Sequence, residues 1–189
     1  PVIVRWPAVI RHSMSKLGDL RRREDFVEVI QGSLDGSVHF IDLATGEARQ
    51  RVAVPREPFA AAITPDGRRL IVANHLHNGR ADAEVVAASV SVIDVAAGKV
   101  EKEIVLPNGS GLLRAVAISP DGKVIYLPSL EKAHWHVIDA LTGDVIKKLA
   151  PDSGAHNTIY GLDGRHAYLA GLKSPLLRVT DTAGHDIVK

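Results

Sequence analysis

The chain has 189 residues, of which 46% are hydrophobic and 24% charged, and no apolar run approaches the ~20 residues that cross a bilayer. We therefore expect a globular protein without a membrane span. The 23 basic and 22 acidic residues leave a formal net charge of +1, which gives no field for nucleic acid, and the absence of cysteine excludes disulfides, thiolate metal sites and cysteine nucleophiles.

Residues 1–25 do not share the pattern of the rest of the chain, and we interpret them as a non-repeat segment or linker. No charged stretch followed by an apolar one occurs there, so no signal peptide is predicted. The stretch PVIVRWPAVIRHS, residues 1–13, resembles a short segment from the C-terminal half of sulfatases. It contains none of the sulfatase nucleophile motif, and we assign no sulfatase activity.

From residue 26 onward two short phrases alternate along the chain. The first, Ile-Asp followed by Gly, occurs at residues 41–46, 93–98 and 138–143, with a degenerate copy at 180–184; the second, Pro-Asp-Gly, occurs at 65–67 and 120–122, with Leu-Asp-Gly at 162–164. Both are turn signals, because Asp can bond the following backbone and Gly accepts a positive φ. The phrases divide the chain into units 26–54, 55–106, 107–150 and 151–189.

Short β-branched or alternating runs lie between these turns. In the second unit they cover residues 60–64, 70–73, 89–93 and 100–106; in the third they cover 115–119, 124–127, 134–138 and 145–149. Four strands in each unit of about 40 to 50 residues, with no helical periodicity, predict an all-β protein: a β-propeller of four-stranded antiparallel blades. About four blades are present, which predicts a partial propeller. Its open edges predict further blades from a longer chain or from a homo-oligomer.

One unit contains an insertion. From Asp66 to Asp94 the chain spans 28 residues, whereas Asp121 to Asp139 spans 18. The longer stretch contains four side chains that could bind a divalent metal, since imidazole and carboxylate are common ligands: His75, His77, Asp82 and Glu84. The alternative is a polar loop for structure or for a partner, shaped by pairing of Arg80 with Asp82. No other cofactor is predicted.

A second set of candidates occupies the same place in successive units. Phe59, Arg114 and His156 each precede the turn aspartate of their unit by seven residues. If the first strand of each blade lines a central channel, these residues lie near its mouth, where an aromatic ring, a guanidinium and an imidazole would suit an anionic or planar ligand. Asn74 and Asn157 are expected polar neighbours and Arg80 a further ligand-binding residue. The alternative is that Arg114 and His156 cap loops or bond water between blades.

His134 and His136 flank Trp135 on a predicted strand, so both imidazoles share one face of a blade. We interpret them as packing between blades, because two ligands do not complete a metal shell. No nucleophile elbow, His-Glu-x-x-His helix or glycine-rich phosphate loop occurs in the sequence.

The phrases ITPDGRRLIVANHLHNGRADAEVVAASVSVIDVAAGKV and AISPDGKVIYLPS resemble the bacterial YVTN-type repeat propellers, and the resemblance covers residues 26–189. It implies a periplasmic or extracellular protein. It does not select a function, because related lactonase-like and nitrite-reductase-like propellers share the blades. Our leading hypothesis is a non-enzymatic module that binds a protein or small molecule at the channel mouth or on the inserted loop. The alternatives are a lactonase-like or redox propeller that acts as an enzyme or binds a cofactor, and a structural part of a cell-surface protein.

Overall fold

A computed structural model of the chain describes residues 36–42, 45–55, 57–75, 88–107, 110, 112–113, 115–129 and 133–189, without the side chains of residues 57 and 75. All regular secondary structure in these ranges is β-strand. They contain no helix that is long and apolar enough to cross a membrane.

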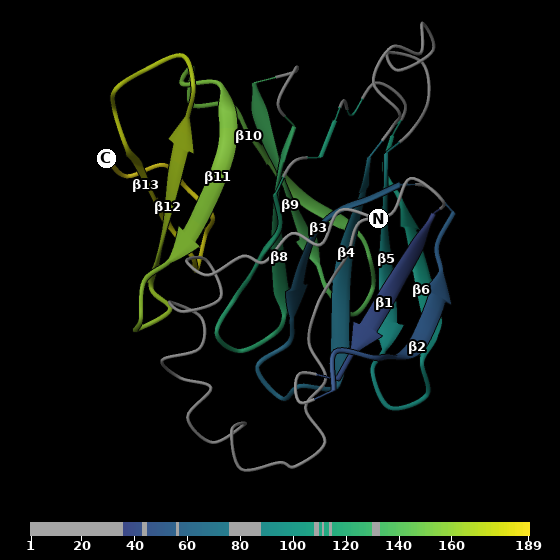
Figure 1. The fold of residues 1–189 in the computed structure, drawn as a ribbon. Coiled ribbons are helices and arrows are strands. Elements are labelled where there is room, and N and C mark those ends of the chain that lie inside the picture. Colours follow the sequence, from purple (N-terminus) through teal and green to yellow (C-terminus); the bar gives the residue numbers. More distant parts are fainter. Residues whose placement is uncertain are drawn as a thin grey trace, which may run out of the picture.

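The strands form four antiparallel sheets that follow one another along the chain (Figure 1). The first sheet contains β1 (Ser37–Ile41) and β2 (Ala48–Ala53). The second contains β3 (Glu57–Ile63), β4 (Arg69–His75), β5 (Ser89–Asp94) and β6 (Lys99–Val105). The third contains β7 (Ala117–Ile118), β8 (Val124–Ser129), β9 (His134–Asp139) and β10 (Val145–Leu149), and the last contains β11 (Ala155–Tyr160), β12 (His166–Gly171) and β13 (Arg178–Asp181).

Within each sheet, every strand pairs with the strand that follows it in the sequence. Figure 1 shows the sheets in succession, from β1 and β2 in purple and blue to β12 and β13 in yellow. Up-and-down sheets of this kind, arranged one after another, are the blades of a propeller. The structure thus confirms the all-β partial propeller that the repeats predict.

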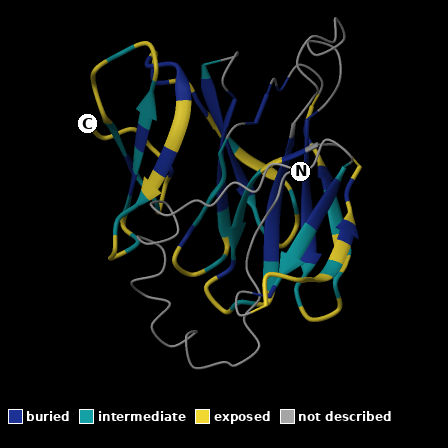
Figure 2. Cartoon of the chain, in the orientation of Figure 1, coloured by how far each residue is buried: buried dark blue, intermediate teal, exposed yellow. Residues whose placement is uncertain are grey.

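Apolar side chains fill the space between each sheet and the next. In β4, Leu70 and Val72 pack toward the first sheet, whereas Ile71 and Ala73 pack toward the third. Burial of both faces explains why this strand is apolar at successive positions instead of every second one. Figure 2 shows the buried residues concentrated in the middle strands, including β4, β5, β8 and β9. Each fully buried aliphatic side chain stabilises the fold by roughly 1.5–3 kcal/mol.

The turns that follow β1, β5 and β9 each need a residue with positive φ. Gly46, Gly98 and Gly143 provide it with φ values of 74°, 59° and 81°, and each donates its N–H to the carbonyl of the turn aspartate four residues earlier. In the last sheet the corresponding residue, four after Asp181, is His185, with φ 54°. A left-handed conformation costs a residue with a Cβ roughly 1–2 kcal/mol, so the contacts of His185 must offset it.

The turns between first and second strands repeat a hydrogen-bonded box. The Ser119 hydroxyl donates to Asp121 Oδ1 at 2.5 Å and accepts the N–H of Val124 at 2.9 Å, and Thr64 makes the equivalent bonds in the second sheet. These hydroxyl bonds are the main cause that lowers the pKa of Asp66 and of Asp121. Gly161 occupies the same place in the last sheet and has no hydroxyl.

The third sheet differs from the sequence prediction at its first strand. A strand was expected over residues 115–119, but β7 contains only Ala117 and Ile118. Pro128 in the neighbouring β8 has no backbone N–H to donate, and pairing resumes only at a single bridge between Leu113 and Ser129. The boundary expected near residue 25, and the sulfatase-like stretch before it, lie outside the described residues.

Candidate functional site

A β-bulge recurs at one end of the first strand in the second and last sheets. In β3, Pro58 pairs with Asn74 and Ala60 with Ala73, so Phe59 is an extra residue. In β11, Ala155 pairs with Gly171 and Asn157 with Ala170, so His156 is the extra residue. A bulged residue leaves the ladder, and its side chain is aimed differently from those of its neighbours.

The third sheet has the same irregularity. Leu113 bridges Ser129, and Ala117 pairs with Tyr126, so the segment between Leu113 and Ala117 contains one residue more than the segment of β8 opposite it. The extra residue falls within residues 114–116, the interval that contains Arg114. Arg114 itself lies outside the described residues. Two of the positions aligned by counting from the turn aspartates, Phe59 and His156, therefore fall at one recurring feature of the backbone.

The bulged side chains of Phe59 and His156 are exposed and come from the first strands of the second and last sheets. Phe59 is 50% exposed and His156 is also exposed. Strand β7 contacts both β3 and β11, so the first strands of the three blades adjoin one another. In a propeller these strands surround the central channel. The exposed ring of Phe59 and the imidazole of His156 thus occupy equivalent places on two blades, with the third sheet between them.

The two predicted asparagine neighbours differ in their surroundings. Asn74 is fully buried between the first and second sheets, where its Nδ2 lies 2.8 Å from Ser91 Oγ, 3.1 Å from Ser89 Oγ and 3.2 Å from Glu103 Oε1. Its Oδ1 has no hydrogen-bond partner among the described residues. Asn157 is exposed, and its Oδ1 accepts the N–H of Thr158. Only Asn157 adjoins His156 on the exposed surface.

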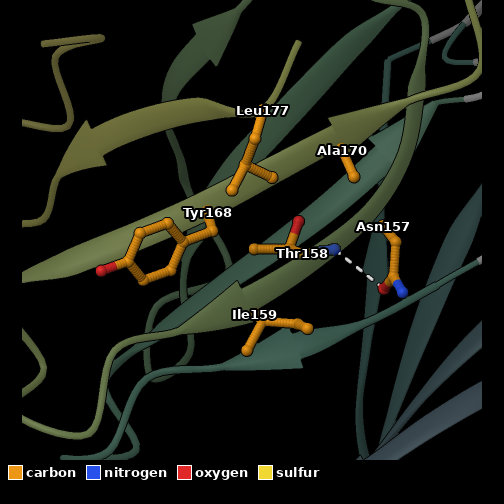
Figure 3. Close-up of a pocket in the computed structure, with 6 residues that line it drawn as sticks. All are labelled: Asn157, Thr158, Ile159, Tyr168, Ala170 and Leu177. Carbon is orange, nitrogen blue, oxygen red and sulfur yellow. Dashed lines mark hydrogen bonds between the residues drawn. The ribbon is translucent and has the colours of Figure 1, made fainter. Parts of the chain in front are cut away.

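Asn157 also lines a shallow hollow of about 200 Å³ on the last sheet (Figure 3). Its other lining residues come from β11, from β12 and from the segment before β13, and none is charged: Thr158, Ile159, Tyr168, Ala170 and Leu177. Thr158 is fixed from behind, because the buried indole of Trp135 donates to its Oγ1 at 2.8 Å. This face of the sheet is therefore apolar and open.

The metal candidates cannot be placed as a set. Residues 76–87, which include His77, Arg80, Asp82 and Glu84, lie outside the described residues, as does the side chain of His75 at the end of β4. Elsewhere in the described ranges, no group of three or more histidine or acidic side chains is arranged to hold a metal ion. The metal site on the inserted loop stays a prediction.

His134 and His136 form a buried pair between the second and third sheets. Their Nε2 atoms lie 3.0 Å apart and their rings meet edge to face. Burial, with smaller contributions from His134 and Lys148, lowers the pKa of His136 to about 4, and its Nδ1 has no hydrogen-bond partner within the part of the chain that the structure describes. The pair packs between blades, as the sequence indicated, and is not open to a ligand.

A second hollow, of about 230 Å³, lies at the opposite end of the last two sheets. Its lining includes Asp121, Asp163, Tyr160 and His185. The buried imidazole of His185 bonds the hydroxyl of Tyr126 at 2.8 Å, and burial lowers the pKa of His185 and raises that of Tyr126. Sequence reasoning missed this contact. The signal was present, since a histidine replaces the glycine expected four residues after Asp181.

No known family profile matches the chain, and no curated protein matches it. Solved structures do match, and 858 of their chains share its architecture. One is hydrazine synthase from Kuenenia stuttgartiensis, at 26% sequence identity and a TM-score of 0.65. The match covers 89% of this chain and 51% of that one, so the chain spans about half the length of the matched structure. The likeness supports a propeller-type domain.

These findings separate three kinds of surface on that domain. The bulged residues provide an aromatic ring and an imidazole at one end of the first strands, and the last sheet provides an uncharged apolar face. The far hollow provides two carboxylates beside a half-buried tyrosine and a buried histidine. Of these, the bulged positions alone repeat from blade to blade.

Proposed function

We propose that this chain is a non-enzymatic binding module of the YVTN-repeat propeller type, which holds a planar anionic ligand at the channel mouth. The recurring β-bulge is the observation that supports the proposal. It turns Phe59 and His156 out of their ladders at equivalent places, and the third bulge falls in the interval that contains Arg114. Stacking on the ring and bonds from the guanidinium and imidazole would recognise a flat carboxylate. A periplasmic or extracellular location is part of this proposal.

The surroundings of His156 agree with a binding role better than with catalysis. His156 has no carboxylate partner among the described residues that would orient it as a general base, and such an orienting group is part of most activated sites. An aromatic ring at one equivalent position and an imidazole at another provide recognition without a nucleophile. The alternative of a lactonase-like or redox propeller is favoured only by the name of the matched synthase.

The test uses benzoate as a planar anionic probe with the full chain labelled for NMR. We expect fast-exchange shifts of the Phe59 and His156 signals, and about tenfold weaker binding in Phe59→Ala and in His156→Ala, which corresponds to about 1.4 kcal/mol each. The matched control is His166→Ala, because His166 lies at the opposite end of the last sheet, where it pairs with Asp181. Unchanged affinity in both variants, or an equal loss in the control, would overturn the proposal.

A further inference from the structure

Each blade has one face that meets the sheet that follows it, and this face is buried in the second and third sheets. Val90 in β5 and Trp135 in β9 lie four residues before their turn aspartates, and both are fully buried. Tyr126 in β8 is also fully buried, against Ala155, Ala167 and Leu169 of the last sheet. Side chains at these positions therefore belong to the interface between blades.

The last sheet presents the same face without a cover from the described residues. Leu177 is the counterpart of Val90 and Trp135, and it is 54% exposed. Ile159, opposite Tyr168 in the ladder, is 60% exposed. Figure 3 shows Leu177, Tyr168 and Ala170 along the hollow on this face. Its positions have the chemistry of a blade interface.

The first sheet presents the opposite kind of face. Ile93 and Ile138 precede their turn aspartates by one residue, are fully buried, and pack toward the preceding sheet. Their counterpart in the first sheet is Ile41, which is only half-buried. His39, two residues earlier on the same side of β1, is half-buried as well. This side of β1 therefore corresponds to the side of β5 and β9 that packs against the preceding sheet in the interior blades.

We propose that a second copy of this chain covers the open face of the last sheet with its first sheet, and that the two copies close one ring. Two sets of four sheets give eight, within the roughly four to eight blades of known propellers. The matched solved structure has about twice the length of the region that this chain matches, so two copies supply a comparable length. The hollow on the open face is lined by uncharged residues, so no like charges meet there.

The contact is head to tail, because it joins two different surfaces, and it occurs twice in the closed pair. It reuses the geometry that already joins the second sheet to the third and the third to the last. Closure limits the assembly to two copies. An open contact of the same kind would instead add copies without limit as the concentration rises.

Sedimentation equilibrium of the full chain tests the proposal. We expect a dimer that does not grow further with concentration, and at least about a tenfold weaker dimer for Leu177→Lys. Ile41→Lys, on the other surface, is expected to weaken it equally. The control is Leu141→Lys: Leu141 is 78% exposed in the turn after β9, away from both surfaces. Circular dichroism melting identifies any variant that fails to fold.

Each outcome decides for or against the closed pair. A wild-type chain that stays monomeric overturns it, as does a series of growing oligomers. A folded Ile41→Lys variant that still forms dimers would show two open faces packed on each other, which also overturns it. If the Ile41→Lys variant does not fold, a mixing experiment takes its place: labelled wild type is mixed with the Leu177→Lys variant, and mixed dimers are measured. A ring built from two surfaces keeps one intact contact in the mixed pair and so forms mixed dimers, whereas two opposed open faces would not. Benzoate binding is measured separately, so the two proposals fail independently.

Discussion

Replacing His136 by glutamine is expected to remove much of the acid sensitivity of this fold. His136 is 4% exposed, lies between the second and third sheets, and has Nε2 3.0 Å from Nε2 of His134. A charged imidazole here would lose its hydration and face a second imidazole, while Lys148 lies opposite it on β10. Folding therefore requires the neutral ring.

The size of the effect follows from the pKa. The pKa of His136 falls from 6.5 to about 4 in the folded chain. Below pH 6.5 the unfolded chain binds a proton that the folded chain does not, so the free energy of unfolding decreases as the pH falls. The slope approaches about 1.4 kcal/mol per pH unit and the loss ends near pH 4, at a total of roughly 3 kcal/mol.

Urea unfolding at a series of pH values between 7 and 4 measures this slope. The carboxylates with lowered pKa values affect a separate pH range, because the stability that they contribute is lost only as the pH falls below about 3.8. These are Asp66, Asp121, Asp139 and Asp181. His156→Gln makes the same chemical change at an exposed site and should leave the slope unchanged. Parallel stability curves for the wild type and His136→Gln would refute the reasoning.

Three further substitutions test the turns and the missed contact by urea unfolding at neutral pH. Ser119→Ala should cost about 1–2 kcal/mol, because it removes the hydroxyl of a buried turn box, and a change below the error of the measurement would count against that role. Gly161→Ser should stabilise the fold by about 0.5–1 kcal/mol, because the new hydroxyl restores the turn box in the last sheet. The Asp163 side chain must shift slightly, since its Oδ1 would lie 3.1 Å from the new Cβ. Tyr126→Phe should cost about 1–2 kcal/mol, because it leaves Nδ1 of the buried His185 without its hydrogen-bond partner; a neutral result would mean that water replaces the hydroxyl.

The strands and their order could be predicted from the sequence because the turn phrases set the register. Counting from Asp94 and Asp139 places Val90 and Trp135 at one level of successive blades, and both are buried as their strands require. The expected strand over 115–119 was wrong in length. The reason is local, since the proline at 128 removes a ladder donor, and the effect of one missing N–H on a neighbouring strand is invisible in the pattern of that neighbour.

The alignment of the candidate residues was predictable from the sequence, but the backbone irregularity at Phe59 and His156 was not. Equal spacing from the turn aspartates aligned Phe59 with His156. The sequence did not predict a bulge at these positions, because a bulge depends on how two strands pair. Asn74 was expected near the ligand and is buried instead, because its strand is packed on both faces. The contact between Tyr126 and His185 joins residues 59 apart in the sequence, and only the packing of two blades brings them together.

The recurring bulge also bears on how such a module can change its ligand. The extra residue is left out of the ladder pairing, so the register of its blade does not depend on which side chain it has. In this chain the same backbone position already contains a phenyl ring in one blade and an imidazole in another. Two blades thus present different side chains at one equivalent position, and new specificities can arise by substitution there without a change in the register of the sheet.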